Sequence, residues 1–239
     1  MSALNEKSKH GHLTVEQDPS GLVRVARETA ESRVIMDLMR GQGGTAKAHF
    51  DVADTIDVSG FPALLGALCE AADLHLDLQF TATRLSSSHV VLEDVGLTLG
   101  AALFQMLTDR MMTTGTNGAG SSLRTANDFT SAPVSASVSV EGRKFLKVVS
   151  ATTIEDMRWR LILGQTLAGN VRSEDVDDFV DALAGGLKGS IFIHEREVHT
   201  DADAFWFETF RAIGHAINEA LAPNPARKGL PPGVKATLF

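Results

Sequence analysis

The residues of this chain best suited to chemistry are its histidines and the carboxylates near them. The 239 residues include eight histidines, one cysteine and no tyrosine. A lone cysteine excludes an intrachain disulfide or a site built from several thiolates, so a bound metal would need imidazole and carboxylate ligands. His89 and Glu93 are four residues apart in a segment with helical spacing, which places them on one helical face. The pair is a candidate for metal binding or acid–base chemistry. Equally, it fits a helix start in which both side chains are only structural.

The composition limits the class of protein. Hydrophobic residues make up 44% and charged residues 22% of the chain, as in an ordinary globular protein. The net charge of −8 argues against general nucleic-acid binding, which needs basic surfaces. No apolar run approaches the roughly 20 residues that cross a bilayer, so no membrane span is expected. The first twenty residues are polar and lack the apolar centre of a signal peptide, which favours a cytoplasmic protein.

The hydrophobic pattern predicts strands and helices in the same order twice. In the first half we expect three antiparallel strands, a helix, a strand and a helix, over residues 22–30, 33–39, 46–52, 61–72, 74–82 and about 89–107. In the second half we expect three strands, a helix, a strand and a helix, over residues 132–140, 144–149, 157–163, from 173, 190–194 and 204–222. The fold class is therefore α+β, with two tandem β-α-β-α repeats whose helices pack on mixed, mostly antiparallel sheets.

Composition shifts divide the chain further. We expect a flexible leader, a first α+β repeat, a mobile loop rich in Gly, Ser and Thr, a second α+β repeat and a basic, Pro-containing tail, at residues 1–20, 21–112, 113–122, 123–222 and 223–239.

Several short segments resemble the imidazoleglycerol-phosphate dehydratase family in their order along the chain. They are RVARETAES at 24–32, GF at 60–61, SHVVLED at 88–94, DR at 109–110, GR at 142–143, FRA at 210–212 and the Pro-rich end with its lysine. No single segment is specific, and the resemblance rests on their shared order from Leu22 to Phe239. It implies a duplicated β-α fold of the dehydratase type, a homo-oligomer (a trimer or larger), and two manganese ions between subunits that dehydrate imidazole glycerol phosphate.

The resemblance also implies a depleted set of metal ligands. The family has a His-His-x-x-Glu pattern at two helix starts. The first start keeps His89 and Glu93, with Val90 in place of the second histidine, whereas the second, near residues 203–205, has no histidine. His194 and Glu208 lie near two further ligand positions. These four ligands are too few for two ions, so we expect a weak site for manganese or another divalent metal, or none.

Basic residues near family phosphate positions are better preserved. They are Arg124, Arg143, Arg211 and Lys235, and each fits either a phosphorylated small molecule or a solvated surface. Glu31 matches a family acid, which makes Glu31, His89 and Glu93 the candidate catalytic residues. Trp206, in an aromatic stretch that replaces the missing histidines, fits either the floor of a ligand pocket or core packing.

Three hypotheses follow. The first is a divergent, lyase-like enzyme that dehydrates, isomerises or cyclises a different small molecule in a biosynthetic pathway. The second is a non-catalytic binding or assembly protein on the same fold. The third is a genuine dehydratase of histidine biosynthesis with relocated metal ligands.

Overall fold

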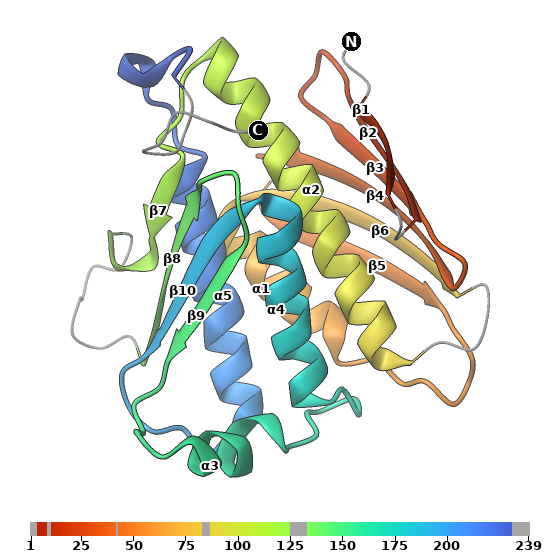
Figure 1. The fold of residues 1–239 in the computed structure, drawn as a ribbon, viewed down its shortest axis with the longest axis vertical. Helices are drawn as coiled ribbons and strands as arrows, with labels where there is room; N and C mark the ends of the chain where they lie inside the picture. The colour runs from red at the N-terminus through yellow and green to blue at the C-terminus, as the bar shows by residue number, and fades with distance from the viewer. Residues whose placement is uncertain (1–3, 9–10, 42, 83–86, 125–132, 231–239) are drawn as a thin grey trace.

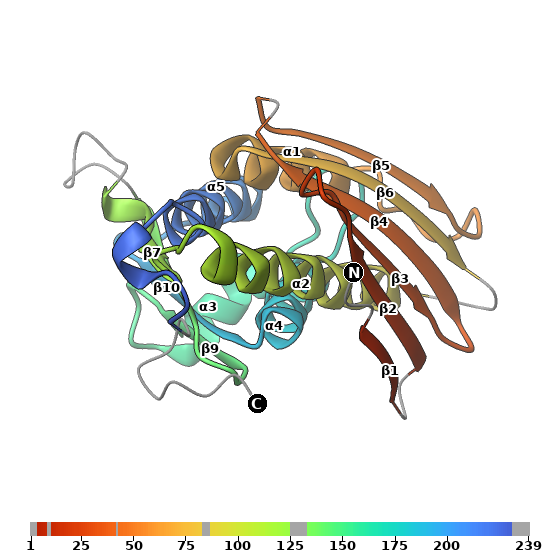
Figure 2. The same ribbon diagram turned by 90° about the horizontal axis from the view of Figure 1, so that it is seen from above.

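Two β-sheets enclose a layer of helices. The computed structural model describes residues 4–8, 11–41, 43–82, 87–124 and 133–230. Within these ranges a six-stranded sheet, in the order β1-β2-β3-β4-β6-β5, faces a four-stranded sheet in the order β7-β8-β10-β9. Figure 2 shows helices α1, α2, α4 and α5 between the two sheets. The buried hydrophobic core therefore lies on both sides of the helical layer.

The two halves of the chain share one topology. The first half comprises β3 (Val23–Glu28), β4 (Ser32–Arg40), β5 (Thr45–Asp51), α1 (Phe61–Ala72), β6 (Leu74–Ala82) and α2 (Ser88–Thr113). The second half comprises β7 (Ala119–Ser121), β8 (Val134–Val140), β9 (Phe145–Val149), α4 (Ser173–Leu187), β10 (Gly189–Glu195) and α5 (Ala202–Ala220). In each half the last strand is inserted between the second and the third, and it runs parallel to the third. The predicted duplicated α+β fold is confirmed, and α2 and α5 are equivalent helices.

Equivalent helix ends are built alike in the two halves. Asp73 caps the C-terminus of α1 and Lys188 caps that of α4, and both residues are in the left-handed conformation with φ near 50°. Each cap donates its backbone N–H to carbonyls of the last helical turn, and the next strand begins at the following residue. This tight reversal lays each helix back against the sheet that its strand joins.

Helix α2 is the central helix of the layer. Gly96 and Gly100 lie against the backbone of α4, and a Cβ at either position would come within 2.5 Å of a carbonyl oxygen of Phe179 or Leu183. Small residues thus allow α2 and α4 to approach closely. By length and apolarity α2 could cross a membrane, but its apolar stretch is 67% buried inside the molecule, as in a core helix.

The expected leader is partly ordered as strands, so that prediction is wrong. β1 (Leu4–Ser8) and β2 (Gly11–Gln17) form an antiparallel hairpin, and β2 pairs with β3. Val15 on β2 is buried in the core. The hairpin extends a sheet whose edge at β3 would otherwise expose unpaired backbone groups.

The prediction of a mobile loop over residues 113–122 is also wrong. Thr113 is the last residue of α2, and β7 pairs with β8. Between them, Gly118 donates its backbone N–H to the carbonyl of Ala220, and the Asn117 side chain donates to the carbonyl of Glu219. These bonds satisfy the last carbonyls of α5, which explains why a Gly-rich segment is fixed here.

Two smaller expectations also need correction. The strand predicted over 157–163 is helical: α3 (Glu155–Arg158) continues into a π-helix at Trp159–Leu163. Short apolar runs do not distinguish strand from helix by periodicity, and this one packs beside α4, with an ion pair between Arg158 and Asp177. β5 is parallel to its neighbour β6, not antiparallel as expected, and β9 is likewise parallel to β10. In the tail, Pro225–Arg227 forms a short 3-10 helix, and residues 231–239 lie outside the described residues.

Candidate functional site

Helices α1, α2, α4 and α5 begin at one end of the molecule, the lower end in Figure 1. Ser87 caps α2 by accepting the backbone N–H of Val90, and Asp201 caps α5 by accepting that of Ala204. Ser88 on α2 donates its hydroxyl to Asp175 on α4, which ties these two starts together. Unpaired N–H groups and aligned helix dipoles make such an end electropositive, so it is suited to acidic residues and to ligands.

The first site at this end is the His89 group, formed by His89 and Glu93 of α2 with Asp175 and Asp178 of α4. The His89 Nδ1 atom lies 2.9 Å from an Asp178 carboxylate oxygen, and its Nε2 atom lies 3.5 Å from a Glu93 oxygen. The side chains of His89, Glu93 and Asp178 are about half exposed, whereas Asp175 is buried. The arrangement presents an oriented imidazole to solvent between two carboxylates.

The His89 group offers ligands for at most one metal ion. Potential ligand atoms of His89, Asp175 and Asp178 lie within 4.8 Å of one another, and this is the one such cluster of three among the described residues. One carboxylate oxygen of Asp175 already accepts a hydrogen bond from the Ser88 hydroxyl. Imidazole with carboxylates suits manganese or zinc, but a two-ion centre needs more ligands than one such cluster supplies. Among the described residues, a single chain therefore brings together fewer ligands than the two-manganese site that the resemblance implies.

A buried polar network fixes the first turns of α2. Asp94 accepts hydrogen bonds from the Arg27 guanidinium on β3 and from the Ser32 hydroxyl on β4. The side chains of Arg27 and Asp94 are only 11% and 7% exposed. A buried carboxylate needs such partners. The network holds α2, and with it His89, against the first sheet.

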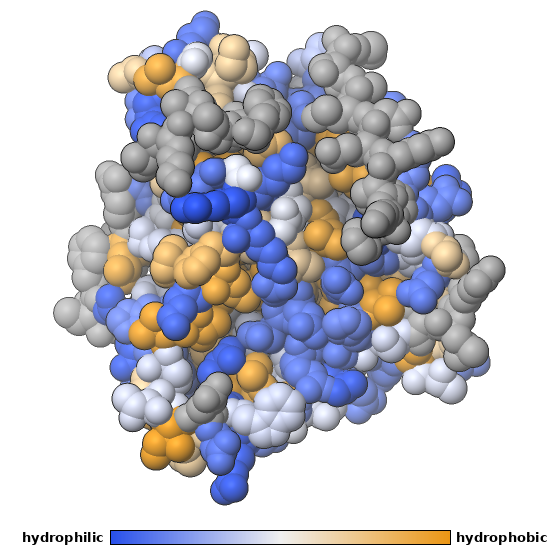
Figure 3. All heavy atoms as spheres, viewed as in Figure 1, coloured by the Kyte–Doolittle hydropathy of each residue, from blue (hydrophilic) through white to orange (hydrophobic). Residues whose placement is uncertain are grey.

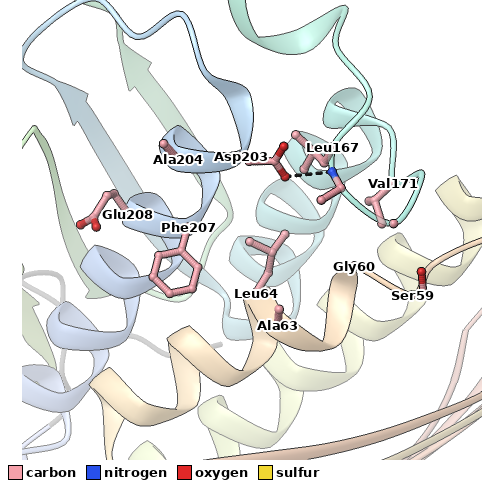
Figure 4. Close-up of a pocket in the computed structure, with 12 residues that line it drawn as sticks. Ser59, Gly60, Ala63, Leu64, Leu167, Val171, Asp203, Ala204, Phe207 and Glu208 are labelled. Carbon is pink, nitrogen blue, oxygen red and sulfur yellow. Dashed lines mark hydrogen bonds between the residues drawn. The ribbon is translucent and has the colours of Figure 1, made fainter.

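The second site at this end is a cavity of about 610 Å³, the α1–α5 cavity. It is lined by Ser59, Gly60, Ala63 and Leu64 before and within α1, by Leu167, Ala168, Gly169 and Val171 before α4, and by Asp203, Ala204, Phe207 and Glu208 of α5. Figure 4 shows the Phe207 ring of α5 directed toward Leu64 and Ala63 of α1. The lining is mainly apolar, with the carboxylates of Asp203 and Glu208 as its charged groups.

The wall of this cavity is a close contact between two loops. A Cβ on Gly60 would lie 2.0 Å from the carbonyl oxygen of Ala168, and Gly169, with φ +71°, touches Gly60 in return. Asn170 donates to Asp57 at 2.8 Å, and the backbone N–H of Ala168 donates to Asp203 at 2.9 Å. The loop before α4 is thus anchored to the starts of both α1 and α5, which keeps the cavity formed.

The aromatic stretch of α5 divides between core and cavity. Phe205 and Trp206 are fully buried, and the Trp206 indole N–H donates to the Ser173 hydroxyl at 2.6 Å. The prediction that Trp206 contacts a ligand is therefore wrong, because its side chain is enclosed by the core. Phe207, which is 42% exposed, lines the cavity in its place. Glu208 also lines it and lies 3.4 Å from Arg211.

The remaining predicted residues lie apart from the His89 group. His194 is exposed on β10, Arg143 lies in the exposed turn between β8 and β9, and Glu31 is exposed in the turn between β3 and β4. Arg124 ends a 3-10 helix (Ser122–Arg124), and Lys235 lies outside the described residues. Within a single chain, the structure does not bring His89, His194 and Glu208 together. Phosphate binding by the four basic residues stays a prediction.

Sequence reasoning missed Asp175 and Asp178 on α4. The spacing of these two residues could have indicated them, because acidic residues three apart share one helical face. Their nearness to His89, however, depends on the packing of α2 against α4. Cys69 is not a candidate nucleophile, because burial in the core raises the pKa of its thiol to about 12.

The family model and the following two relatives that match this chain have the same name. Residues 56–217 match the family model described as imidazoleglycerol-phosphate dehydratase. The dehydratase of Paracoccus denitrificans is 27% identical over 222 residues, which cover 90% of this chain and 98% of that protein. The dehydratase of Streptococcus mutans is 30% identical over 161 residues, which cover 66% of this chain and 67% of that protein.

Solved structures agree in fold. The dehydratase of Staphylococcus aureus superposes with a TM-score of 0.57 at 16% identity, covering 80% of this chain and 95% of that one. The dehydratase of Pyrococcus furiosus superposes with a TM-score of 0.58 at 19% identity, covering 89% and 99%. The duplicated architecture is thus shared over nearly the whole of those chains.

Proposed function

The chain belongs to the imidazoleglycerol-phosphate dehydratase family, and from this premise we propose that it is a divergent lyase acting on another small molecule. It would dehydrate, isomerise or cyclise that molecule in a biosynthetic pathway of the cytoplasm. One observation carries the proposal: the start of α5 lines an apolar cavity with no histidine, while the equivalent start of α2 keeps an oriented histidine. The family depends on metal, and this donor set supports at most one ion.

We propose that His89 is the residue that transfers a proton in this reaction. With the Nδ1–H bonded to Asp178 at 2.9 Å, the basic nitrogen is Nε2, which faces Glu93 and solvent. Nε2 accepts a proton from a carbon atom of the substrate, and the carboxylates of Asp178 and Glu93 lie on either side of the ring. His89 can then return that proton to a leaving hydroxyl or to another carbon of the same substrate. Asp178 acts as the positioning residue.

We also propose that the protein forms a homo-oligomer, a trimer or larger. On the face shown in Figure 3, apolar side chains gather over the four-stranded sheet. Phe145 on β9 and Phe192 on β10 are nearly half exposed and lie 5.3 Å apart between ring centroids. An exposed apolar sheet face of this kind fits a contact between copies. Light scattering of Phe192→Glu tests this: a smaller particle supports the contact, and an unchanged particle opposes it.

The experiment for the reaction has two arms. In the first, the chain is expressed in a histidine auxotroph that lacks its own dehydratase, with the Paracoccus enzyme as a positive control. We expect no growth without histidine. Growth that depends on His89 would favour the genuine dehydratase instead.

In the second arm, the purified protein is incubated with a metabolite extract and followed by mass spectrometry. We expect wild type to consume a compound and to yield a product lighter by one water, or an isomer. His89→Gln should abolish that change, whereas His49→Gln, at an exposed position on β5 outside the group, should retain it. Conversion that survives His89→Gln would remove His89 from the mechanism. No conversion by wild type would favour the non-catalytic binding protein.

A further inference from the structure

From the lining and charge of the α1–α5 cavity we infer that it binds a small molecule with an apolar body and a cationic amine, and that it rejects anions. The inference goes beyond the proposed function and does not depend on it. The binding itself needs no turnover.

The size and surface of the cavity define the apolar body. Its volume of about 610 Å³ falls within the range of pockets that hold small organic ligands. Side chains of Ala63, Leu64, Leu167, Val171 and Phe207 form most of its surface. The Phe207 ring offers a face for an aromatic ring or for a cation.

The charges of the lining define the polar end. Asp203 and Glu208 carry the charges of the lining, and none of its residues is Lys, Arg or His. One Asp203 oxygen accepts the Ala168 backbone N–H, which leaves its second oxygen for a ligand. Glu208 is partly exposed and forms an ion pair with Arg211 at 3.4 Å, which offsets part of its charge. An anion in the same place would meet the Asp203 carboxylate, which has no cationic partner in the lining.

Helix ends could in principle reverse this preference, because α1 and α5 begin at the cavity. At α5, however, Asp201 already accepts the Ala204 N–H, and Asp203 adds negative charge in the first turn. At α1, Pro62 in the first turn has no N–H to offer, and no side chain caps the other N–H groups of that turn. On the α5 side of the cavity, these carboxylates therefore favour a cationic group.

The test uses three probes with one apolar body: 4-phenylbutylamine, 4-phenylbutanol and 4-phenylbutyrate. Isothermal titration of the full chain should show the amine binding at least ten-fold more tightly than the alcohol, and the carboxylate most weakly. Equal or tighter binding of 4-phenylbutyrate would overturn the inference. Absence of amine binding at millimolar concentration would also overturn it.

Variants locate the site and its charge. Ala63→Phe should abolish binding of the amine by filling the cavity, whereas Ala226→Phe, at an exposed position outside the lining, should leave it unchanged. Asp203→Asn combined with Glu208→Gln should reduce amine affinity about ten-fold, to that of the alcohol. The amide introduced by Asp203→Asn would keep an oxygen for the Ala168 N–H, so the loop is retained. Amine binding that survives Ala63→Phe would place the ligand elsewhere.

The outcome separates this inference from the proposed reaction. His89→Gln lies outside the lining and should bind the amine with unchanged affinity. Amine binding by a protein without lyase activity would leave the cavity assignment standing and remove the reaction. Lyase activity in a protein that does not bind the amine would remove only the cavity assignment.

Discussion

The starts of α2 and α5 occupy equivalent places in the two halves of the fold, yet they differ in chemistry. At the start of α2, His89 and its carboxylate partners form a polar, half-exposed group. At the start of α5, Phe205 and Trp206 enter the core while Phe207 lines an apolar cavity. Both helices are capped by a side chain and packed in the same layer. A duplicated scaffold can thus keep its packing while the residues at its helix starts change independently.

The two starts are also held in different ways. Asp94 secures α2 through a buried ion pair with Arg27 and a hydrogen bond from Ser32. The α5 start is secured by aromatic packing and by the bond between Trp206 and Ser173. The start of α2 thus depends on a buried ion pair and the start of α5 on aromatic packing. Substitutions in these two groups should therefore destabilise the protein by different amounts.

The largest expected effect is that of Asp94→Ala. Removing the carboxylate shared by Arg27 and Ser32 disrupts a buried ion pair, and we expect a loss of about 3–5 kcal/mol in the free energy of unfolding. Urea denaturation measures it. The control is Asp181→Ala, which removes the half-exposed pair with Lys144 and should cost no more than about 1 kcal/mol. Similar losses in both variants would show that the network does not fix α2.

Trp206→Phe should have a smaller effect at the α5 start. The variant keeps an aromatic ring but loses the hydrogen bond to Ser173 and leaves a small void, which costs about 1–3 kcal/mol. Ser173→Ala in the same background should add little, because the two residues share one bond. Additive losses would contradict that coupling.

Phe207→Ala, at a partly exposed position, should reduce the free energy of unfolding by less than Trp206→Phe.

Glu195 on β10 gives a pH-dependent contribution near the α5 start. Burial alone would raise the pKa of Glu195, but hydrogen bonds from the Ser150 hydroxyl and from backbone N–H groups of Ala151 and His199 outweigh it and lower the pKa. A lowered folded-state pKa adds stability above the unfolded pKa, and this stability is lost as the pH falls through the folded value. We expect Glu195→Gln to cost about 1–3 kcal/mol at neutral pH. The difference from wild type should shrink on acidification below about pH 4. A difference that is constant with pH would exclude the ionised carboxylate as its source.

His89→Gln should have the smallest effect on stability. The imidazole is half exposed and its contacts with carboxylates are near the surface, so we expect a change within about 0.5 kcal/mol. Thermal unfolding of the variant beside wild type measures it. A loss comparable to that of Asp94→Ala would make His89 a structural residue and weaken its proposed chemical role.

Local sequence patterns predicted the architecture because the core requires them. The alternation of Leu74–Ala82 and the helical spacing of Phe61–Ala72 matched the observed elements at both ends. The hairpin at β1 and β2 was missed because its polar residues form an edge of the sheet and carry little apolar pattern. The fixed segment before β7 was missed because its order comes from bonds to the distant end of α5.

The candidate site was only partly predictable. The spacing of His89 and Glu93 identified one helix face, but Asp178 joins them through the packing of α4 on α2. The aromatic stretch at 205–207 suggested a pocket, but its sequence did not reveal which ring faces the core. Helical rotation at the start of α5 buries Trp206 and leaves Phe207 at the cavity.

The most direct test of the difference between the two helix starts is the number of manganese ions bound per chain after dialysis against the metal, measured by atomic emission. The start of α5 offers no histidine, so we predict at most one ion per chain in wild type and a clear loss of that ion in His89→Gln. Two ions per chain, retained in His89→Gln, would contradict the account, because they would require a complete metal site in which the start of α2 has no essential part.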